Sequence, residues 1–126
     1  MNKQPTILII EDDIFLNNIY NKRLSGENFN VLTAFDGEKG IKAAKQKLPD
    51  LILLDLMLPK MDGFAIIKYC KKDEDLKNIP IILLTNLNDK DDIEKALSLG
   101  VKDYLIKVHF TPAEVVDKIK NVLSKK

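Results

Sequence analysis

The stretch LILLDLMLPKMDG, residues 51–63, decides the fold class. Its first four residues form an unbroken apolar run, too short for a buried helix and without polar alternation, which predicts a central parallel strand covered on both faces. Asp55 ends this run, and Pro59 and Gly63 break the chain into a loop directly afterwards. Asp is a common turn former, so Asp55 alone could simply cap that turn. In open α/β sheets, however, ligands bind at the carboxyl ends of strands, where Asp55 is expected.

Three further apolar runs end in polar residues of the kinds that a binding site needs. The runs at 7–10, 81–84 and 104–106 are followed by Glu11 and Asp12, by Thr85, and by Lys107. Because the carboxyl ends of parallel strands meet at one edge of a sheet, these side chains should gather there with Asp55. The sequence therefore predicts an acidic pocket that also holds a hydroxyl and a single cation.

Taken together, these residues resemble the response-regulator receiver domain of two-component signalling. The acid pair after the first strand, Asp55 in the pattern Asp-x-x-x-Pro-x-x-Asp-Gly, Thr85 after the fourth strand and Lys107 after the fifth follow the family's order over nearly the whole chain. The resemblance implies a flavodoxin-like receiver fold with five helices and a doubly wound, five-stranded parallel sheet of order 2-1-3-4-5, an order for which a receiver is a standard example.

The residues between the strands independently predict an α/β domain. Apolar residues there recur at helical spacing, so five strands should alternate with five helices, placed on both sheet faces by right-handed crossovers. Asp36 is a candidate N-cap, Gly26 and Gly100 are candidate helix ends, and residues 111–114 form a capping box. Residues 31–34 are less apolar than the other strands and should lie at a sheet edge.

The helix before Gly100 has a narrow apolar face. Ile93, Ala96 and Leu97 supply its inward residues. A narrow face means weak anchoring, which suits an element that must shift.

Composition excludes several classes of protein. A chain of 126 residues suits one domain, and we expect residues 1–126 to form a single receiver without an output domain. A net charge of +1 does not indicate direct binding to nucleic acid or to an anionic membrane. Cys70 is the single cysteine, which excludes an internal disulfide, and it is expected to be a buried or half-buried helix residue. No apolar segment is long enough for a signal peptide or a membrane span, so a cytoplasmic protein without membrane insertion is expected.

The predicted pocket needs a counter-charge. Glu11, Asp12 and Asp55 cannot all stay ionised at close range unaided, because neighbouring carboxylates raise one another's pKa. One divalent cation together with Lys107 balances their charge, and an all-oxygen ligand set favours Mg²⁺, with Mn²⁺ as a plausible substitute.

A carboxylate can also attack phosphorus to form an aspartyl phosphate. The resemblance implies that Asp55 is the phosphoacceptor, and it implies a role for each remaining pocket residue. Asp12 binds the metal directly, Glu11 acts through water, Met57 offers its backbone carbonyl to the metal, Lys107 bridges to the phosphoryl group, and Thr85 donates a hydrogen bond to it.

Three other polar residues lie near this pattern. We interpret Asp13 as the cap of the first helix rather than a ligand, and Asp62 as a residue that orders the loop before Gly63. His109 is the single histidine. It invites a phosphohistidine role, but the acceptor chemistry is already supplied by Asp55, so an isolated surface histidine is the preferred interpretation.

By resemblance, the function is that of a stand-alone receiver. It accepts a phosphoryl group from a phosphohistidine of a histidine kinase or a histidine phosphotransfer protein, and is not an enzyme beyond its own phosphorylation and dephosphorylation. Movement of Thr85 and inward turning of Tyr104 would then alter the face made by the fourth helix, fifth strand and fifth helix. A downstream protein, whose identity the sequence does not give, would bind that face.

Two alternatives belong to other classes. A pseudo-receiver would keep the fold as an interaction module without phosphorylation, and Asn86, where the family usually has a small residue, could crowd the pocket. A metal-dependent phosphatase of the haloacid-dehalogenase type would need a second acid two residues after Asp55, where Met57 stands. Retention of the pocket groups favours the receiver over both.

Two departures from the family give further predictions. The proline that usually follows the pocket lysine is Val108 here, and a cis bond before a non-proline residue costs about 2.5–4 kcal/mol, so the Lys107–Val108 peptide should be trans. Met57 and Leu87 lie two residues after the acceptor and the threonine, where side chains influence the hydrolytic water. Neither orients water strongly, which predicts slow self-dephosphorylation.

Overall fold

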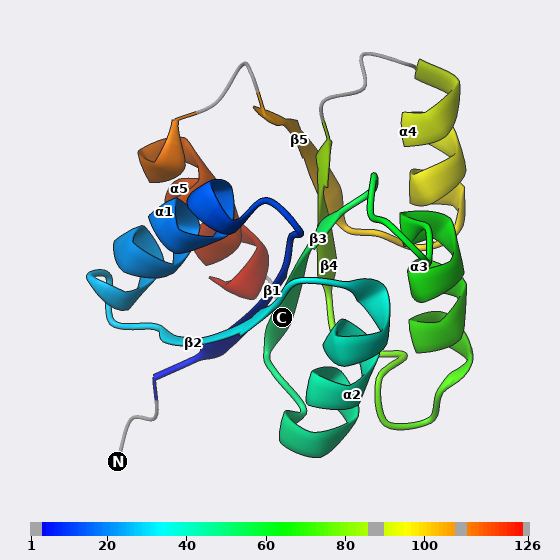
Figure 1. The fold of residues 1–126 in the computed structure, drawn as a ribbon, viewed down its shortest axis with the longest axis horizontal. Helices are drawn as coiled ribbons and strands as arrows, with labels where there is room; N and C mark the ends of the chain where they lie inside the picture. The colour runs from blue at the N-terminus through cyan, green and yellow to red at the C-terminus, as the bar shows by residue number, and fades with distance from the viewer. Residues whose placement is uncertain (1–3, 86–89, 108–110, 125–126) are drawn as a thin grey trace.

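Five parallel strands in the order β2-β1-β3-β4-β5 form the sheet of the computed structural model, which describes residues 4–85, 90–107 and 111–124 (Figure 1). The strands are β1 (Thr6–Ile10), β2 (Asn30–Ala34), β3 (Leu51–Asp55), β4 (Ile81–Thr85) and β5 (Asp103–Ile106). The helices are α1 (Ile14–Ser25), α2 (Gly37–Lys47), α3 (Gly63–Lys72), α4 (Lys90–Ser98) and α5 (Pro112–Ser124). The predicted doubly wound fold and its strand order are confirmed.

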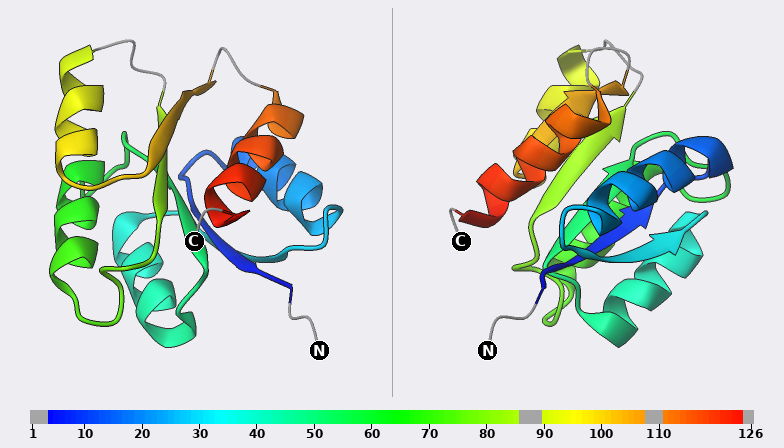
Figure 2. Two further views of the ribbon diagram at one scale, coloured as in Figure 1. Left: turned by 180° about the vertical axis from the view of Figure 1, so that it is seen from behind. Right: turned by 90° about the vertical axis from the view of Figure 1, so that its left-hand side faces the viewer.

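Helices cover both faces of the sheet, as Figures 1 and 2 show from opposite sides. α1 and α5 pack on one face with one core cluster, and α2, α3 and α4 pack on the other with a second. Successive residues of a strand point to opposite faces, so Leu53 joins the first cluster and Leu54 the second. This two-sided burial is why residues 51–54 and 81–84 read as unbroken apolar runs.

β2 lies at one edge of the sheet, as predicted, and pairs with β1. Its residues are mostly half-buried, whereas every residue of β3 is buried. At the other edge, β5 begins one residue earlier than the apolar run suggested and ends at Ile106, so Lys107 follows it directly.

α4 is anchored by few side chains. Ala96 is its one buried residue, which confirms the narrow apolar face. The prediction that Leu97 faces inward is wrong, because its side chain is 41% exposed. Successive helix residues are turned by about 100°, so when Ala96 points into the core the next residue points towards solvent.

Side chains cap the starts of α1, α2, α3 and α5. Asp13, Asp36 and Asp62 each accept a hydrogen bond from the backbone N–H three residues on, at 2.8–3.1 Å. Thr111 and Glu114 cap α5 reciprocally, each main-chain N–H donating to the other's side chain at 3.2 Å. Asp13 is therefore the cap of α1, as predicted, whereas Asp62, which we expected to order the loop before Gly63, also caps α3.

The loop after β3 is closed by a contact that only glycine permits. Gly63 donates its N–H to the Leu56 carbonyl at 3.0 Å. A Cβ atom added at Gly63 would lie 2.7 Å from Leu56 Cα, closer than real side chains come. This close approach folds residues 56–62 back over the end of β3, next to Asp55.

Among the described residues, no helix has the length and apolar character that a bilayer crossing requires.

Candidate functional site

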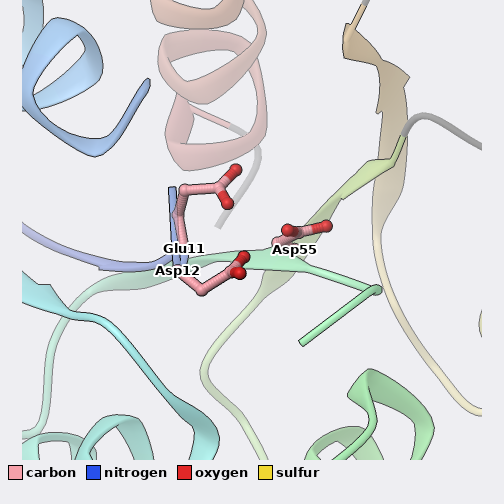
Figure 3. A group of neighbouring side chains, drawn as sticks. All are labelled: Glu11, Asp12 and Asp55. Carbon is pink, nitrogen blue, oxygen red and sulfur yellow. The ribbon is translucent and has the colours of Figure 1, made fainter. Parts of the chain in front are cut away.

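Three carboxylates gather at the carboxyl edge of the sheet, between the ends of β1 and β3 (Figure 3). Glu11 and Asp12 directly follow β1, and Asp55 is the last residue of β3. One oxygen from each carboxylate lies within 4.8 Å of the others. Glu11 and Asp55 are buried, with 1% and 4% of their surface exposed, whereas Asp12 is exposed. The structure therefore brings together the three acids that the sequence singled out.

Lys107 is the cation of this site. Its side chain is buried and forms ion pairs with Glu11 and with Asp55, whose Oδ2 lies 3.2 Å from Nζ. Burial alone would lower the pKa of Lys107, but hydrogen bonding to Glu11 and the charge of both carboxylates raise it above its ordinary value. The ammonium therefore stays charged and offsets one of the three negative charges.

Glu11 is held on both sides. Its Oε1 pairs with Lys107, and its Oε2 accepts a hydrogen bond from the Asp13 N–H at 3.2 Å. Burial raises the pKa of Glu11 to about 7, although the hydrogen bond from Lys107 works in the opposite direction. One lysine does not fully compensate two buried acids and an exposed third.

Asp55 has both carboxylate oxygens engaged. Oδ1 accepts a hydrogen bond from the Met57 N–H at 3.1 Å, and Oδ2 faces Lys107. The Met57 side chain itself is 59% exposed on the rim. The predicted use of the Met57 carbonyl as a metal ligand stays a prediction.

The donor set fits a hard divalent cation. All the converging side-chain ligands are oxygens, a net negative charge remains after Lys107, and one ligand, Asp12, opens to solvent so that water can complete the shell. Receiver-type chemistry with Mg²⁺ is thus compatible with these residues, while no cysteine or histidine joins the cluster among the described residues.

Thr85 and Tyr104 lie near this edge on β4 and β5. Thr85 is fully buried at the last position of β4, paired in register with Ile106, which precedes Lys107. Tyr104 pairs in register with Leu83 and is half-buried against the core under α2, α3 and α4. Their switch roles remain predictions. The predictions for Asn86, Leu87, His109 and the Lys107–Val108 peptide concern residues outside the described ranges.

Sequence reasoning missed Asn17. It is fully buried on α1, and its amide Nδ2 donates to the Glu11 carbonyl at 3.0 Å and to the Ala34 carbonyl at 3.4 Å. The spacing of residues 17, 20 and 24 already places Asn17 on the same helix face as two core residues. A polar residue on that face was the signal that could have revealed it.

Comparison with known proteins finds relatives along nearly the whole chain. A family model described as the response regulator receiver domain matches residues 7–120. Similar curated proteins include "Probable transcriptional regulator ycf27" of Porphyridium aerugineum, 39% identical over 96% of this chain and 49% of the relative. Another is the "DNA-binding dual master transcriptional regulator RpaA" of Synechocystis, 39% identical over 94% of this chain and 49% of that protein. The chain thus spans about half the length of these relatives.

A solved structure shows the same architecture. The signal receiver domain of a signal transduction histidine kinase from Syntrophus aciditrophicus superimposes with a TM-score of 0.86 at 30% identity. The match covers 96% of this chain and 91% of that one. Sequence similarity and fold similarity therefore both indicate a receiver domain.

Proposed function

The chain belongs to the response-regulator receiver family, and on that premise we propose that Asp55 accepts a phosphoryl group from a phosphohistidine in a Mg²⁺-dependent reaction. The phosphohistidine belongs to a histidine kinase or a histidine phosphotransfer protein. One observation carries this proposal: Asp55 ends a buried strand between an acid pair and Lys107. Its carboxylate supplies the nucleophile, and Lys107 supplies a compensating positive charge.

The transfer needs one bond to form as another breaks. A carboxylate oxygen of Asp55 attacks phosphorus, the P–N bond of the donor breaks, and its electron pair stays on the imidazole nitrogen. Lys107, already 3.2 Å from Asp55 Oδ2, meets the negative charge of the phosphoryl oxygens. Thr85 donates a hydrogen bond to one of these oxygens. Beyond this phosphorylation and its reversal by hydrolysis, the chain has no catalytic role.

The acid pair supports the same chemistry. Asp12, Asp55 and the Met57 carbonyl would hold Mg²⁺, or Mn²⁺ in its place, and Glu11 would act through water. When bound, the cation neutralises phosphoryl oxygens and so lowers the barrier to attack by a carboxylate.

The response is a change of surface on α4, β5 and α5. Thr85 moves towards the phosphoryl group and Tyr104 turns inwards, and α4 follows because Ala96 alone is buried on it. Residues 1–126 act as one receiver domain, and a downstream protein, rather than nucleic acid, binds the altered face. The net charge of +1 agrees with a protein partner.

The test is phosphorylation by a small phosphodonor in the presence of Mg²⁺. We expect intact-mass measurement to show the gain of one phosphoryl group, loss of the adduct with hydroxylamine, which cleaves acyl phosphates, and no adduct in Asp55→Asn. Asp13→Asn is the matched control, because Asn also caps helices and Asp13 belongs to α1. It should be phosphorylated like the parent.

Absence of an adduct in the parent, together with no Mg²⁺ affinity, would replace this proposal by the pseudo-receiver. An adduct that persists in Asp55→Asn would move the acceptor to another residue.

A further inference from the structure

Asn17 is a buried polar residue on an otherwise apolar helix face. It is the fourth residue of α1, and its backbone N–H donates to the Asp13 carbonyl at 2.9 Å. Tyr20 and Leu24, on the same face, are core residues. A leucine would suit this position by packing alone.

The Asn17 amide joins three elements. Its Nδ2 donates to the carbonyl of Glu11, just after β1, and to the carbonyl of Ala34, at the end of β2. The Ala34 carbonyl also accepts a hydrogen bond from the Glu11 N–H at 3.1 Å. The main chain of Glu11 is thereby fixed at both its N–H and its carbonyl.

The amide of Asn17 is less favourable for stability than an apolar side chain would be at this position. Within the described part of the chain, no group donates a hydrogen bond to Asn17 Oδ1, which is buried. An unsatisfied buried polar atom destabilises the folded state. We therefore looked to its two donor contacts, with the carbonyls of Glu11 and Ala34, for a role that offsets this cost.

The peptide that Asn17 holds is the one that places the acid pair. Within the described residues, no hydrogen bond or ion pair fixes the exposed Asp12 carboxylate, so the main chain between Glu11 and Asp12 decides where it lies relative to Asp55. We propose that Asn17 is a positioning residue that locks this peptide and thereby preorganises the acid pair for a divalent cation. The inference rests on the proposed function, because it concerns the same metal site.

The test compares Asn17→Leu with its parent by amide NMR. We expect Mg²⁺ titration to show about tenfold weaker binding, the lower end of the effect of groups that orient metal ligands, because Asn17 acts through the backbone. Without metal, hydrogen exchange of the Glu11 amide should accelerate relative to the Ile9 amide inside β1.

Two controls separate positioning from stability. Asn18→Leu makes the same change at the next, exposed position of α1, and Leu24→Ala removes core packing at the far end of the helix. Both should leave Mg²⁺ affinity and the relative exchange of Glu11 unchanged, even where Leu24→Ala lowers the melting temperature. If Asn17→Leu does not fold, Asn17→Ala removes the same donor with less bulk.

Mg²⁺ affinity of the Asn17 variant within twofold of the parent would overturn the inference while leaving the proposed function intact. A parent that shows no Mg²⁺ shifts would instead sink the metal part of the proposed function. In that case the exchange rate of Glu11 still decides, and an unchanged rate would overturn the role of Asn17.

Discussion

Lys107 reaches past an intervening strand to pair with Asp55, its Nζ lying 3.2 Å from Oδ2 although β4 separates β5 from β3. The side chain is buried, and it also pairs with Glu11. A single lysine therefore links the two acidic strand ends. Much of the metal-free stability of this edge should depend on it.

Lys107→Met tests this dependence, because methionine keeps the length of the side chain without its charge. We expect a loss of about 3 kcal/mol in unfolding free energy without metal, the low end for breaking a buried ion pair, since the site opens to solvent at Asp12. Urea denaturation measures it. Lys120→Met, which removes an exposed pair with Glu27, should leave the stability nearly unchanged. Equal effects would contradict a special role for Lys107.

Removing one negative charge should stabilise the metal-free protein. Asp12→Asn relieves repulsion from two neighbouring carboxylates without breaking an ion pair, and each such repulsion is worth about 1 kcal/mol at 4 Å in water. Asp55→Asn should gain less, because it also removes a partner of Lys107. Thermal melting with a chelator present measures both.

Mg²⁺ should narrow the stability difference between Asp12→Asn and the parent. At ten times its Kd, a ligand that binds only the folded state adds about 1.4 kcal/mol, so the parent should gain that much and Asp12→Asn should gain little. A parent whose melting does not respond to Mg²⁺ would contradict a functional metal site.

Gly63→Ala should destabilise the loop over Asp55. The added Cβ would lie 2.7 Å from Leu56 Cα and 2.9 Å from its carbonyl oxygen, so the main chain must move, at about 1–3 kcal/mol. Gly26→Ala is the matched control, since its Cβ meets nothing closer than 3.5 Å and its φ of −72° suits alanine. The urea midpoints of the two variants should differ clearly, and equal midpoints would show that the loop can yield.

Cys70 should make stability fall at high pH. Burial raises the pKa of its thiol to about 11, above the roughly 8.5 of an unfolded cysteine. Because the folded state holds this proton more tightly, the contribution is complete below pH 8.5 and is lost as the pH rises towards 11.

Urea denaturation at pH 8 and pH 10 measures this loss, about 1–2 kcal/mol from the thiol alone. Cys70→Ala is the control, because it keeps every other titrating group. A parent and variant with the same pH dependence would show that the thiolate is tolerated in the fold.

The sequence predicted the fold and the acid cluster because both follow from short local patterns. Buried strands gave unbroken apolar runs, and residues placed directly after them had to meet at one sheet edge. The burial of Asn17 and the exposure of Leu97 were not predicted, because neither follows from a short local pattern. The side a helix residue faces depends on how the helix is rotated against its sheet, and the partners of Asn17 are carbonyls on two different strands.

The last prediction concerns the lifetime of the phosphorylated state. Hydrolysis needs a water in line with phosphorus, and Met57, whose N–H donates to Asp55 Oδ1, stands on the rim with its side chain largely exposed. A thioether is a weak acceptor and orients water poorly. Met57→Asn should therefore speed decay of the phosphorylated protein by about tenfold, below the 10²–10⁴-fold range for positioned proton-transfer groups. Leu87→Glu is expected to act in the same direction.

The measurement is loss of phosphorylated protein in excess Mg²⁺ after removal of the donor, with Met57→Leu as the apolar control that keeps the parent rate. If the double variant that combines Met57→Asn and Leu87→Glu decays no faster than the parent, water access does not limit hydrolysis. The segment that follows Lys107 is then the next place to look.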